Sequence, residues 1–374
     1  MHKTFSFFLT VLLLVPSIAF AQIETRAKQA IVMDYETGTV LLSKNADEQM
    51  PTSSMSKVIT MYAVFEALEN KALSLTDTLP VSEKAWRMGG SKMFVEVDKR
   101  VKVEDLIRGV IIQSGNDATI VLAEGIAGTE EAFADILNAK AKSLGMNNSR
   151  FANASGWPDP NHYSTARDLA TLGSAIIKDF PSLYKYYAEK EFTFNNIKQA
   201  NRNPLLYRGI GADGIKTGHT EAAGYGLIGS GTENGRRVVM VINGLEDERA
   251  RAEESAKLLE WGLKRFENKT LAKAGQVIGN AEVVMGKAPS VGLTVKKDLL
   301  LTLPKMAEAN IKIQIKYNGP LIAPVKEGQE IGTLEITIPG MEPVTKPVFA
   351  AQTVEELGLF AKTLAKTKLF IRGR

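Results

Sequence analysis

The sequence predicts an α+β protein in which an antiparallel sheet flanked by helices is followed by a small all-β domain and a terminal amphipathic helix. Strand-like segments lie near residues 30–42 and 224–245, whereas residues 101–180 between them have a mainly helical pattern. Beyond about residue 269, apolar and polar residues alternate, which is typical of antiparallel strands with one buried face. We therefore expect one sheet built from distant parts of the chain, with a helical subdomain packed against it.

The first residues predict export. His2 and Lys3 precede an apolar stretch at residues 5–20, and residues 19–21 (Ala-Phe-Ala) have the small-x-small pattern of a signal-peptide cleavage site. The apolar stretch is short for a membrane span. We therefore predict a secretory signal peptide at residues 1–21.

The catalytic part of the chain is predicted at residues 22–268. It begins with a hairpin of two short strands, and a strong helix follows the hairpin. A second hairpin turns at Asn234-Gly235, a strong signal for a tight turn. The expected elements are strands at 30–33 and 40–42, a helix through Met55, Val58, Ile59, Tyr62, Phe65 and Leu68, helices at 103–112 and 132–144, strands at 226–228 and 238–242, and a helix at about 248–266.

Composition excludes several kinds of chemistry. The chain has no cysteine, so it can form no disulfide and use no catalytic thiol. A net charge of +4 is too mild to indicate nucleic acid as a partner. The chain contains no His-Glu-x-x-His motif or similar spacing of metal ligands, so no metal site is predicted. It also contains no Gly-x-Ser-x-Gly motif, which an α/β-hydrolase would need. A hydrolase built from this sequence must therefore use serine, lysine, carboxylates or amide dipoles, and we expect no cofactor and no metal.

A serine and a lysine three residues apart suggest a nucleophile and its base. Ser54 and Lys57 lie near the start of a predicted helix, on one face of it. A desolvated lysine beside other cations has a lowered pKa and can take a proton from a serine hydroxyl. Alone, the pattern is more often an ordinary helix cap with a solvated lysine, and residues 182–185 match it as well.

Two further motifs follow in order. Ser114-Gly115-Asn116 joins two helical segments, where Ser114 could relay protons beside Lys57 and the Asn116 amide could hold a substrate carbonyl. Lys216-Thr217-Gly218 enters a strand, where lysine and threonine can bind a carboxylate and glycine allows close approach of a ligand. Each motif alone could be a simple turn. Together, in this order, they favour a catalytic cleft.

With these motifs, the chain resembles the low-molecular-mass penicillin-binding proteins, specifically the D-alanyl-D-alanine carboxypeptidases of the penicillin-binding protein 5 and 6 subgroup. The resemblance covers nearly the whole chain. It rests on longer runs at residues 114–117 (Ser-Gly-Asn-Asp), 191–197 (Glu-Phe-Thr-Phe-Asn-Asn-Ile) and 213–220 (Asp-Gly-Ile-Lys-Thr-Gly-His-Thr). It implies a catalytic domain of the β-lactamase/transpeptidase type at the periplasmic face of the bacterial inner membrane.

The resemblance also implies the reaction, which is removal of the last D-alanine from peptidoglycan pentapeptide stems, with β-lactams as covalent inhibitors. The implied roles are Ser54 as acylated nucleophile, Lys57 as its base, Ser114 and Asn116 lining the cleft, Lys216, Thr217, Gly218 and Arg251 binding the substrate terminus, and the backbone amides of Ser54 and His219 as the oxyanion hole. Arg249 is the alternative to Arg251. One departure is Ser155, where some relatives carry a histidine, and it bears on the rate of deacylation.

The C-terminal part is predicted as an all-β domain at residues 269–350, followed by an amphipathic helix at 353–374. The helix would place apolar residues on one face and basic residues largely off it, so we expect it to lie on a membrane surface. An alternative is a helix docked on the β domain. The apolar residues are Leu357, Phe360, Ala361, Leu364 and Ile371, and the basic ones are Lys362, Lys366, Lys368, Arg372 and Arg374.

Three rival functions remain at this stage. A class A β-lactamase needs a glutamate in a Glu-x-x-Leu-Asn motif, but Ala134 occupies that position before Leu137-Asn138. An endopeptidase that cuts D-amino-acid crosslinks would use the same residues as a carboxypeptidase. A non-catalytic wall-binding protein could retain the fold, although the intact serine and lysine set argues against it.

Overall fold

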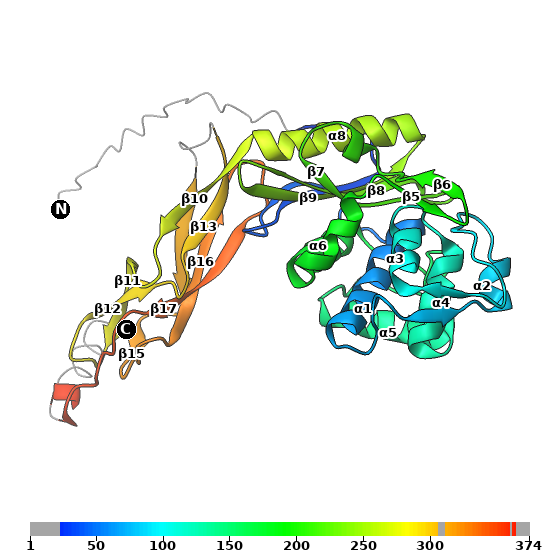
Figure 1. Ribbon diagram of the computed structural model, residues 1–374. Helices are drawn as coiled ribbons and strands as arrows, with labels where there is room; N and C mark the ends of the chain where they lie inside the picture. Colours follow the sequence, from blue (N-terminus) through cyan, green and yellow to red (C-terminus); the bar gives the residue numbers. More distant parts are fainter. Residues whose placement is uncertain (1–22, 306–310, 360, 364–374) are drawn as a thin grey trace.

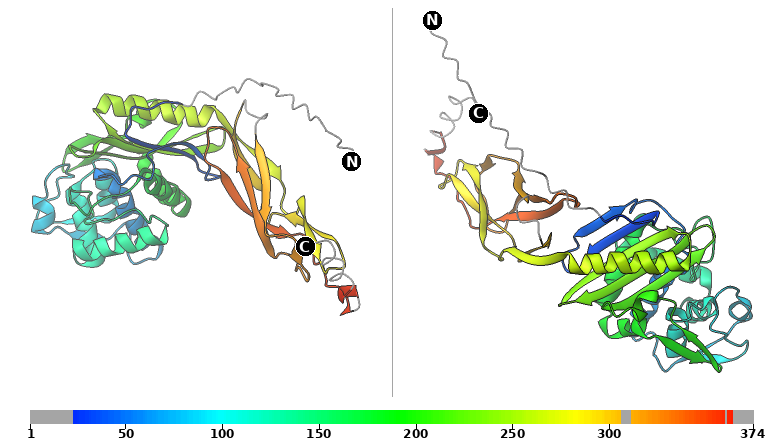
Figure 2. Two further views of the ribbon diagram at one scale, coloured as in Figure 1. Left: turned by 180° about the vertical axis from the view of Figure 1, so that it is seen from behind. Right: turned by 90° about the horizontal axis from the view of Figure 1, so that it is seen from above.

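The structure is a computed structural model, and it describes residues 23–305, 311–359 and 361–363. The predicted signal peptide and residues 360 and 364–374 of the predicted terminal helix lie outside the described residues. The prediction of a helix from residue 353 is wrong at its start, because residues 353–358 are not helical and Val354 and Glu356 form β-bridges with Val325 and Gly286. Figure 1 shows a sheet with helices on both faces and, beyond the long helix α8 (Glu248–Lys264), a β domain that extends away from it. The two views in Figure 2 show the same arrangement from behind and from above.

Strands from both ends of the catalytic domain form its five-stranded sheet, in the order β2-β1-β9-β8-β7 with all pairs antiparallel. Ala30 of β1 lies opposite Ile242 of β9, so the sheet joins segments far apart in sequence, as predicted. The strand β7 is an edge strand. The bounds are β1 Gln29–Asp34, β2 Val40–Lys44, β7 Ala212–Thr220, β8 Gly224–Glu233 and β9 Arg236–Leu245.

Both faces of this sheet are buried, because successive side chains of a strand point to opposite faces. In β9, Val238, Met240 and Ile242 pack into the core beneath α8. The intervening Val239 and Val241 belong to the core shared with the helices on the other face. The hairpin between β8 and β9 turns at Asn234 (φ 50°) and Gly235 (φ 79°), as the Asn-Gly signal predicts.

The helical region lies between β2 and β7 and packs on the face opposite α8 (Figure 1). Its central helix, α1, is buried on all sides from Lys57 to Phe65, so Val58, Ile59 and Phe65 all lie in the core. The helices are α1 Lys57–Glu69, α2 Glu83–Arg87, α3 Val103–Ile111, α4 Asn116–Ala127, α5 Glu130–Ser143, α6 Ala166–Asp179 and α7 Pro181–Tyr184, with short 3₁₀ turns at Ser53–Ser56, Lys185–Ala188 and Pro204–Tyr207.

Two small antiparallel strand pairs in this region were not predicted. One pairs β3 (Thr78–Pro80) with β4 (Arg100–Lys102), across an intervening segment that carries α2. The other pairs β5 (Glu191–Phe194) with β6 (Ile197–Ala200) through Asn195 and Asn196, both at positive φ. Asparagine tolerates this left-handed conformation, so the Asn-Asn pair was a readable turn signal.

The C-terminal domain is all-β, as predicted. Its main sheet has the order β14-β16-β17-β12-β11-β15, and β10 pairs with β13 beside it. The predicted boundary at 268/269 falls within β10. The strands are β10 Phe266–Ala272, β11 Val277–Val284, β12 Ser290–Thr294, β13 Leu299–Pro304, β14 Lys312–Tyr317, β15 Leu321–Ile322, β16 Glu330–Thr337 and β17 Val344–Ala350.

The alternation in these strands predicted one buried face, and this holds better for the inner strands than for the edge. Leu334 and Ile336 of β16 are buried in the domain core. In β14, Ile313 is 52% exposed although it keeps the alternating pattern. The reason is that β14 is an edge strand with β16 as its neighbour in the sheet, so less of the domain covers it.

Polar contacts join the two domains. Thr37, in the turn between β1 and β2, shares a 2.6 Å hydrogen bond with Thr302 of β13. Arg167, at the start of α6, forms an ion pair with Glu342 at 2.8 Å. Within the described part of the chain, no helix is both long and apolar enough to cross a bilayer.

Candidate active site

The 3₁₀ turn that precedes α1 presents a serine beside a buried lysine. Ser53 has a φ of 50°, and this left-handed turn carries the chain into residues 53–56 and then into α1. Lys57 has no exposed surface, and its Nζ lies 2.8 Å from the Oγ of Ser54. The predicted spacing therefore brings the two groups into direct contact.

The other partners of Lys57 hold its amine in place. Its Nζ lies 2.7 Å from Oδ1 of Asn116 and 2.6 Å from the backbone oxygen of Ser155. A neutral amine has two N–H groups and one lone pair. Because the amide oxygen and the carbonyl oxygen can only accept, the two N–H groups donate to them and the lone pair faces the Ser54 hydroxyl. This is the geometry of a general base beside its nucleophile.

Burial makes the neutral form accessible. It lowers the pKa of Lys57 to about 7, with a further lowering by the charge of Arg202 and an opposing effect of Asp117. Burial also lowers the pKa of Lys216 well below its ordinary value, and the charges of Lys57, Arg202 and Arg251 add to this. The cleft thus gathers four cationic side chains that disfavour one another's charge.

The second motif turns sharply at its serine. Ser114 is buried and has a φ of 59°. The amide of Asn116 is engaged at both ends, because Oδ1 accepts from Lys57 and Nδ2 donates to the backbone oxygen of Gly89 at 2.9 Å. The predicted contact of Asn116 with a substrate carbonyl remains a prediction, and in this structure its amide positions the base.

Asp117 fixes the loop that faces this motif. Its buried carboxylate accepts hydrogen bonds from the backbone N–H groups of Met93, Phe94 and Val95, at 2.8, 2.8 and 3.1 Å. These bonds hold the loop between α2 and β4 beside the cleft.

The third motif lies on the edge strand β7, which packs directly against the 3₁₀ turn. Lys216 and Thr217 are buried, and a methyl group on Gly218 would lie 2.9 Å from the backbone oxygen of Thr52. Only glycine permits this approach, which brings the His219 backbone close to the turn that carries Ser54. The ring of His219 is exposed and stacks on Tyr225 at a centroid distance of 3.8 Å.

The structure distinguishes the two candidate arginines. Arg251 is buried beside the sheet, its guanidinium lies over the ring of Tyr225 at 5.4 Å, and its Nε is a buried donor without a hydrogen-bond partner among the described residues. Arg249 points to solvent, and its side chain forms an ion pair with Glu253 at 2.8 Å. The Nη2 of Arg251 lies 3.7 Å from the exposed Glu248, so its Nε is the donor left free. Of the two, Arg251 has the burial and the free donor that a carboxylate site needs.

Sequence reasoning missed several contributors to the site. Arg202, just after the β5–β6 hairpin, donates to Ser91 at 2.5 Å and lies close enough to lower the pKa values of both lysines. The backbone oxygen of Ser155 bonds Lys57, a contact that side-chain identity could not reveal. His162 bonds the hydroxyl of Ser56 at 2.7 Å, and burial lowers its pKa to about 4.

The β-lactamase alternative needs a glutamate that activates water near Ser54. Ala134 lies within α5. The side-chain amide of the neighbouring Asn138 donates to the backbone oxygens of Ala134 and Phe151 and accepts from the backbone N–H of Phe151. Among the described residues, the hydrogen-bond partners of Lys57 include no carboxylate. The same residues contain no group of three or more histidine, aspartate or glutamate side chains that could hold a metal.

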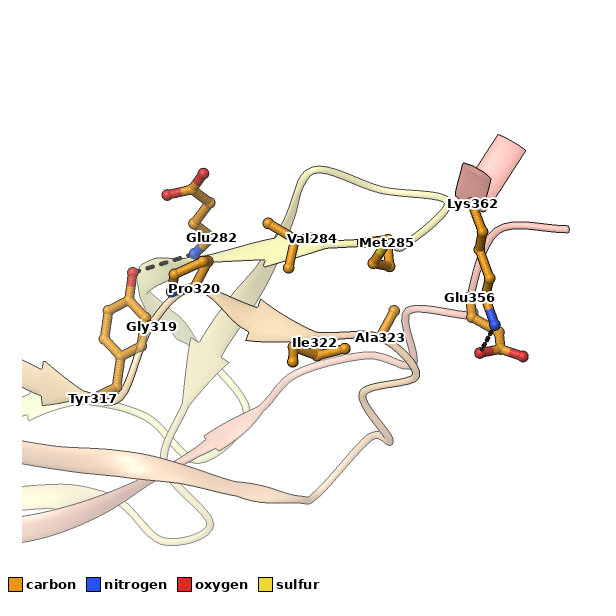
Figure 3. Close-up of a pocket in the computed structure, with 10 residues that line it drawn as sticks. All are labelled: Glu282, Val284, Met285, Tyr317, Gly319, Pro320, Ile322, Ala323, Glu356 and Lys362. Carbon is orange, nitrogen blue, oxygen red and sulfur yellow. Dashed lines mark hydrogen bonds and ion pairs between the residues drawn. The ribbon is translucent and has the colours of Figure 1, made fainter. Parts of the chain in front are cut away.

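A cavity lies in the C-terminal domain, away from Ser54 and Lys57 (Figure 3). Its volume is about 1060 Å³, and its lining includes Tyr317, Ile322, Glu356 and Lys362. Glu356 and Lys362 form an ion pair with each other, and the Tyr317 hydroxyl accepts from the backbone N–H of Glu282 at 3.2 Å. Cavity size therefore does not mark the reactive site in this molecule.

Comparisons with known proteins agree with this geometry. The D-alanyl-D-alanine carboxypeptidase family, peptidase S11, matches residues 17–246. The C-terminal domain of penicillin-binding protein 5 matches residues 266–356. The chain belongs to the D-alanyl-D-alanine carboxypeptidase family. Its fold is the transpeptidase-like fold of penicillin-binding protein 5, with the all-β C-terminal domain of that protein, as the resemblance implied.

Individual relatives cover most of the chain. The D-alanyl-D-alanine carboxypeptidase DacC of Escherichia coli (strain K12) is 40% identical over 344 residues, which is 90% of this chain and 86% of that protein. The crystal structure of penicillin-binding protein 5 from Haemophilus influenzae has a TM-score of 0.77 and 38% identity, covering 89% of this chain and 99% of that one. Penicillin-binding protein D2 from Listeria monocytogenes, solved in an ampicillin-bound form, has a TM-score of 0.59 and 32% identity over 64% of this chain and 98% of that one.

Proposed function

We propose that this serine carboxypeptidase removes the terminal D-alanine from peptidoglycan pentapeptide stems, with Ser54 as nucleophile and Lys57 as base. The observation that carries the proposal is the environment of Lys57. Its amine is fully buried, contacts Ser54 at 2.8 Å and is oriented by two acceptors that leave its lone pair for the serine proton. A helix cap with a solvated lysine would show none of these features.

In acylation, Lys57 takes the hydroxyl proton of Ser54 while Oγ attacks the carbonyl carbon of the penultimate D-alanine. The backbone N–H groups of Ser54 and His219 stabilise the oxyanion that develops. Collapse of the tetrahedral intermediate breaks the peptide bond, and the proton passes to the departing amine, for which Ser114 is the candidate relay. Water then hydrolyses the ester, with Lys57 taking its proton and Ser54 recovering its own.

The terminal carboxylate of the substrate explains the remaining cations. Lys216, Thr217 and Arg251 would bind it at the edge of β7. Burial and like charges lower the pKa of Lys216 in the empty cleft, and a bound carboxylate would favour its charged form. These cations therefore suit a substrate with a free carboxylate next to the scissile bond, as in D-alanyl-D-alanine.

A β-lactam should label the nucleophile, as the ampicillin-bound form of the Listeria relative supports. Incubation with a fluorescent penicillin should give a stable ester, seen by mass spectrometry on the peptide that contains Ser54. Ser54→Ala should lose the label and keep the fold, and Ser182→Ala, at the second match to the same pattern, should keep the label. An adduct that persists on Ser54→Ala would refute the assignment.

We further propose that the protein is exported to the periplasm and held at the inner membrane by its C-terminal segment. The sequence of residues 1–21 supports export, and the basic, amphipathic pattern of residues 353–374 supports attachment to anionic lipid. Val354 is buried in the β-domain core, so a clean test should leave it in place. Deletion of residues 359–374 should release the protein from anionic vesicles in a flotation assay, with hydrolysis of a soluble peptide unchanged. Continued flotation would refute this anchor.

A further inference from the structure

The C-terminal domain carries two apolar side chains that are almost entirely in solvent. Ile322 of β15 is 72% exposed, and Leu359, three residues after the β-bridge of Glu356, is 88% exposed. Among the other described residues, no large apolar side chain exceeds 53%. Single exposed apolar residues are common on protein surfaces, but a pair at one place marks a surface that meets a partner.

Backbone contacts bring these two side chains to one corner of the domain. Ile322 pairs with Val284 at the end of β11. The next residue, Met285, accepts a hydrogen bond from the backbone N–H of Leu357 at 2.8 Å. Residues 284 and 285 thus hold both β15 and the segment that leads to Leu359. Figure 1 shows this corner at the end of the β domain that lies away from the catalytic domain.

The surface around Ile322 is also apolar, because it borders the C-terminal-domain cavity of Figure 3. The apolar residues that line this cavity beside Ile322 are Val284, Met285, Pro320 and Ala323. Glu282 lines it as well, at the end where Tyr317 lies and away from Lys362 (Figure 3).

The acidic residues of the C-terminal segment are paired with lysines. Glu355 forms an ion pair with Lys287, and Glu356 forms one with Lys362. A paired carboxylate repels an anionic surface much less than an unpaired one. These two glutamates therefore do not oppose contact between this corner and anionic lipid.

The course of the chain identifies the partner of this corner. Residues 364–374 continue from it, and their sequence contains four basic residues and no acidic one. We have proposed above that this segment attaches to anionic lipid. A bilayer bound there would begin only a few residues after Leu359. The apolar corner is thus continuous with the proposed membrane segment, which favours a lipid surface over a soluble protein as its partner.

We propose that the side chains of Ile322 and Leu359, which we call the apolar tip, enter the bilayer interface as a second membrane contact beside the basic terminal segment. The proposal rests on the membrane attachment proposed above and adds a contact made by the β domain itself. Apolar side chains of surface-bound segments reach about 5–10 Å into the boundary between headgroups and acyl chains. Two contacts would fix the tilt of the β domain, whereas one would let it rotate.

A fluorescent label at the tip tests this contact directly, because the chain has no cysteine of its own. Ile322→Cys, in the chain from residue 22 to 374, would carry a polarity-sensitive fluorophore. Vesicles of phosphatidylethanolamine and phosphatidylglycerol are then added. We expect the emission to shift to the blue and to be quenched by lipids that carry a nitroxide on the upper acyl chain.

Val277→Cys is the matched control for this label. Val277 is 53% exposed and begins the same strand, β11, that ends at the partner of Ile322. Seven residues separate it from Val284, which is about 23 Å along a strand. That distance exceeds the depth of the interface, so a label at position 277 should show neither the shift nor the quenching.

A substitution measures how much the contact contributes. Ile322→Gln should weaken partition into the same vesicles about threefold to tenfold, because an apolar side chain would no longer leave water. Val277→Gln should stay within about twofold of the unaltered protein. Both side chains are largely exposed, so neither change should unfold the domain, and thermal unfolding followed by circular dichroism would check this.

The outcomes separate this proposal from membrane attachment itself. If the unaltered protein does not float with the vesicles, the attachment fails and the tip contact fails with it. If the protein floats but the label at position 322 shows no shift, only the tip contact is overturned. Equal shifts at positions 322 and 277 would also overturn it, because they would mean that the domain lies along the bilayer.

Discussion

The cavity of the C-terminal domain and the site around Ser54 differ in the charged groups that they contain. The C-terminal-domain cavity has a volume of about 1060 Å³. Its charged residues are exposed or paired, as Glu356 is with Lys362. The cleft beside Ser54 instead contains two fully buried lysines and a buried arginine, with no carboxylate hydrogen-bonded to Lys57 among the described residues.

The difference shows that the catalytic domain contains buried cations that lower its stability and serve the reaction. An unpaired cation in a protein interior is unfavourable, and proteins normally avoid it or neutralise it. In the catalytic domain this unfavourable arrangement lowers the pKa of Lys57 to about 7 and leaves the Nε of Arg251 without a hydrogen-bond partner among the described residues. The C-terminal domain contains no comparable arrangement in its described part, so we expect it to contribute stability and placement and to take no part in the chemistry.

The largest difference between the two regions should appear when the buried base, Lys57, is removed. Lys57→Ala should lower the rate of acylation on the order of 10⁴-fold, because the site offers no other group placed to take the Ser54 proton. The measurement is the second-order rate of labelling by a fluorescent penicillin. Lys362→Ala, in the cavity of the C-terminal domain, should leave that rate unchanged. Similar labelling rates for both variants would show that acylation of Ser54 does not depend on the buried lysine.

The pH dependence of acylation should follow the lowered pKa of Lys57. Below about pH 7 the ammonium form predominates and cannot accept a proton, so the rate should fall about tenfold per pH unit and reach about one hundredth of its plateau at pH 5. Above pH 7 the rate should level off. Stopped-flow labelling between pH 5 and pH 9 would check this, with circular dichroism to confirm that the fold persists. A rate that keeps rising up to pH 9 would indicate a lysine of ordinary pKa.

Arg251 provides a finer comparison, between buried and exposed cations within one helix. Arg251→Ala should lower kcat/KM for D-alanyl-D-alanine peptides about thirtyfold, because a buried arginine would no longer meet the substrate carboxylate. Arg249→Ala, two residues away and ion-paired at the surface, should change kcat/KM by less than about twofold. Equal effects of the two substitutions on peptide hydrolysis would contradict the role assigned to Arg251.

The smallest effect on activity is expected from damage to the C-terminal domain. Ile336→Ala removes a fully buried side chain and should lower the free energy of unfolding of that domain by about 2–5 kcal/mol. Hydrolysis of a soluble peptide should stay within about twofold of the unaltered protein at temperatures where both domains are folded. Denaturant unfolding and a peptide assay on the same samples measure both quantities. A large loss of kcat would show that the β domain acts on the cleft.

The sequence predicted the fold class and the order of the main elements because each depends on local patterns. Alternation at residues 311–338 predicted strands, the Asn234-Gly235 pair predicted a hairpin, and helical spacing from Met55 to Leu68 predicted α1. The exposure of Ile313 was not predictable, since alternation does not tell whether a strand lies at the edge of a sheet. The two small strand pairs were missed for another reason, because their strands are only three or four residues long.

The site was predictable where side-chain identity carried the signal, and less so where the backbone did. Ser54 and Lys57 meet because helical spacing places them together. The contact of Lys57 with the Ser155 carbonyl, and the packing of Gly156 on Ser53, depend on how a loop folds back on the nucleophile turn. The influence of Arg202 on the lysines arises from tertiary proximity, which no local pattern reports.

The pairing of β1 with β9 has a consequence for the way the molecule assembles. About two hundred residues separate Ala30 from Ile242, and closing a loop of that length is slow compared with forming the helices inside it. The edge strand β7 meets the nucleophile turn only when this sheet is complete. A chain that is shortened before β9 would therefore carry Ser54, Lys57 and β7 without the strand that joins β1 to β8 and β7 in one sheet. We therefore expect the site to form late in folding, once β1 has paired with β9.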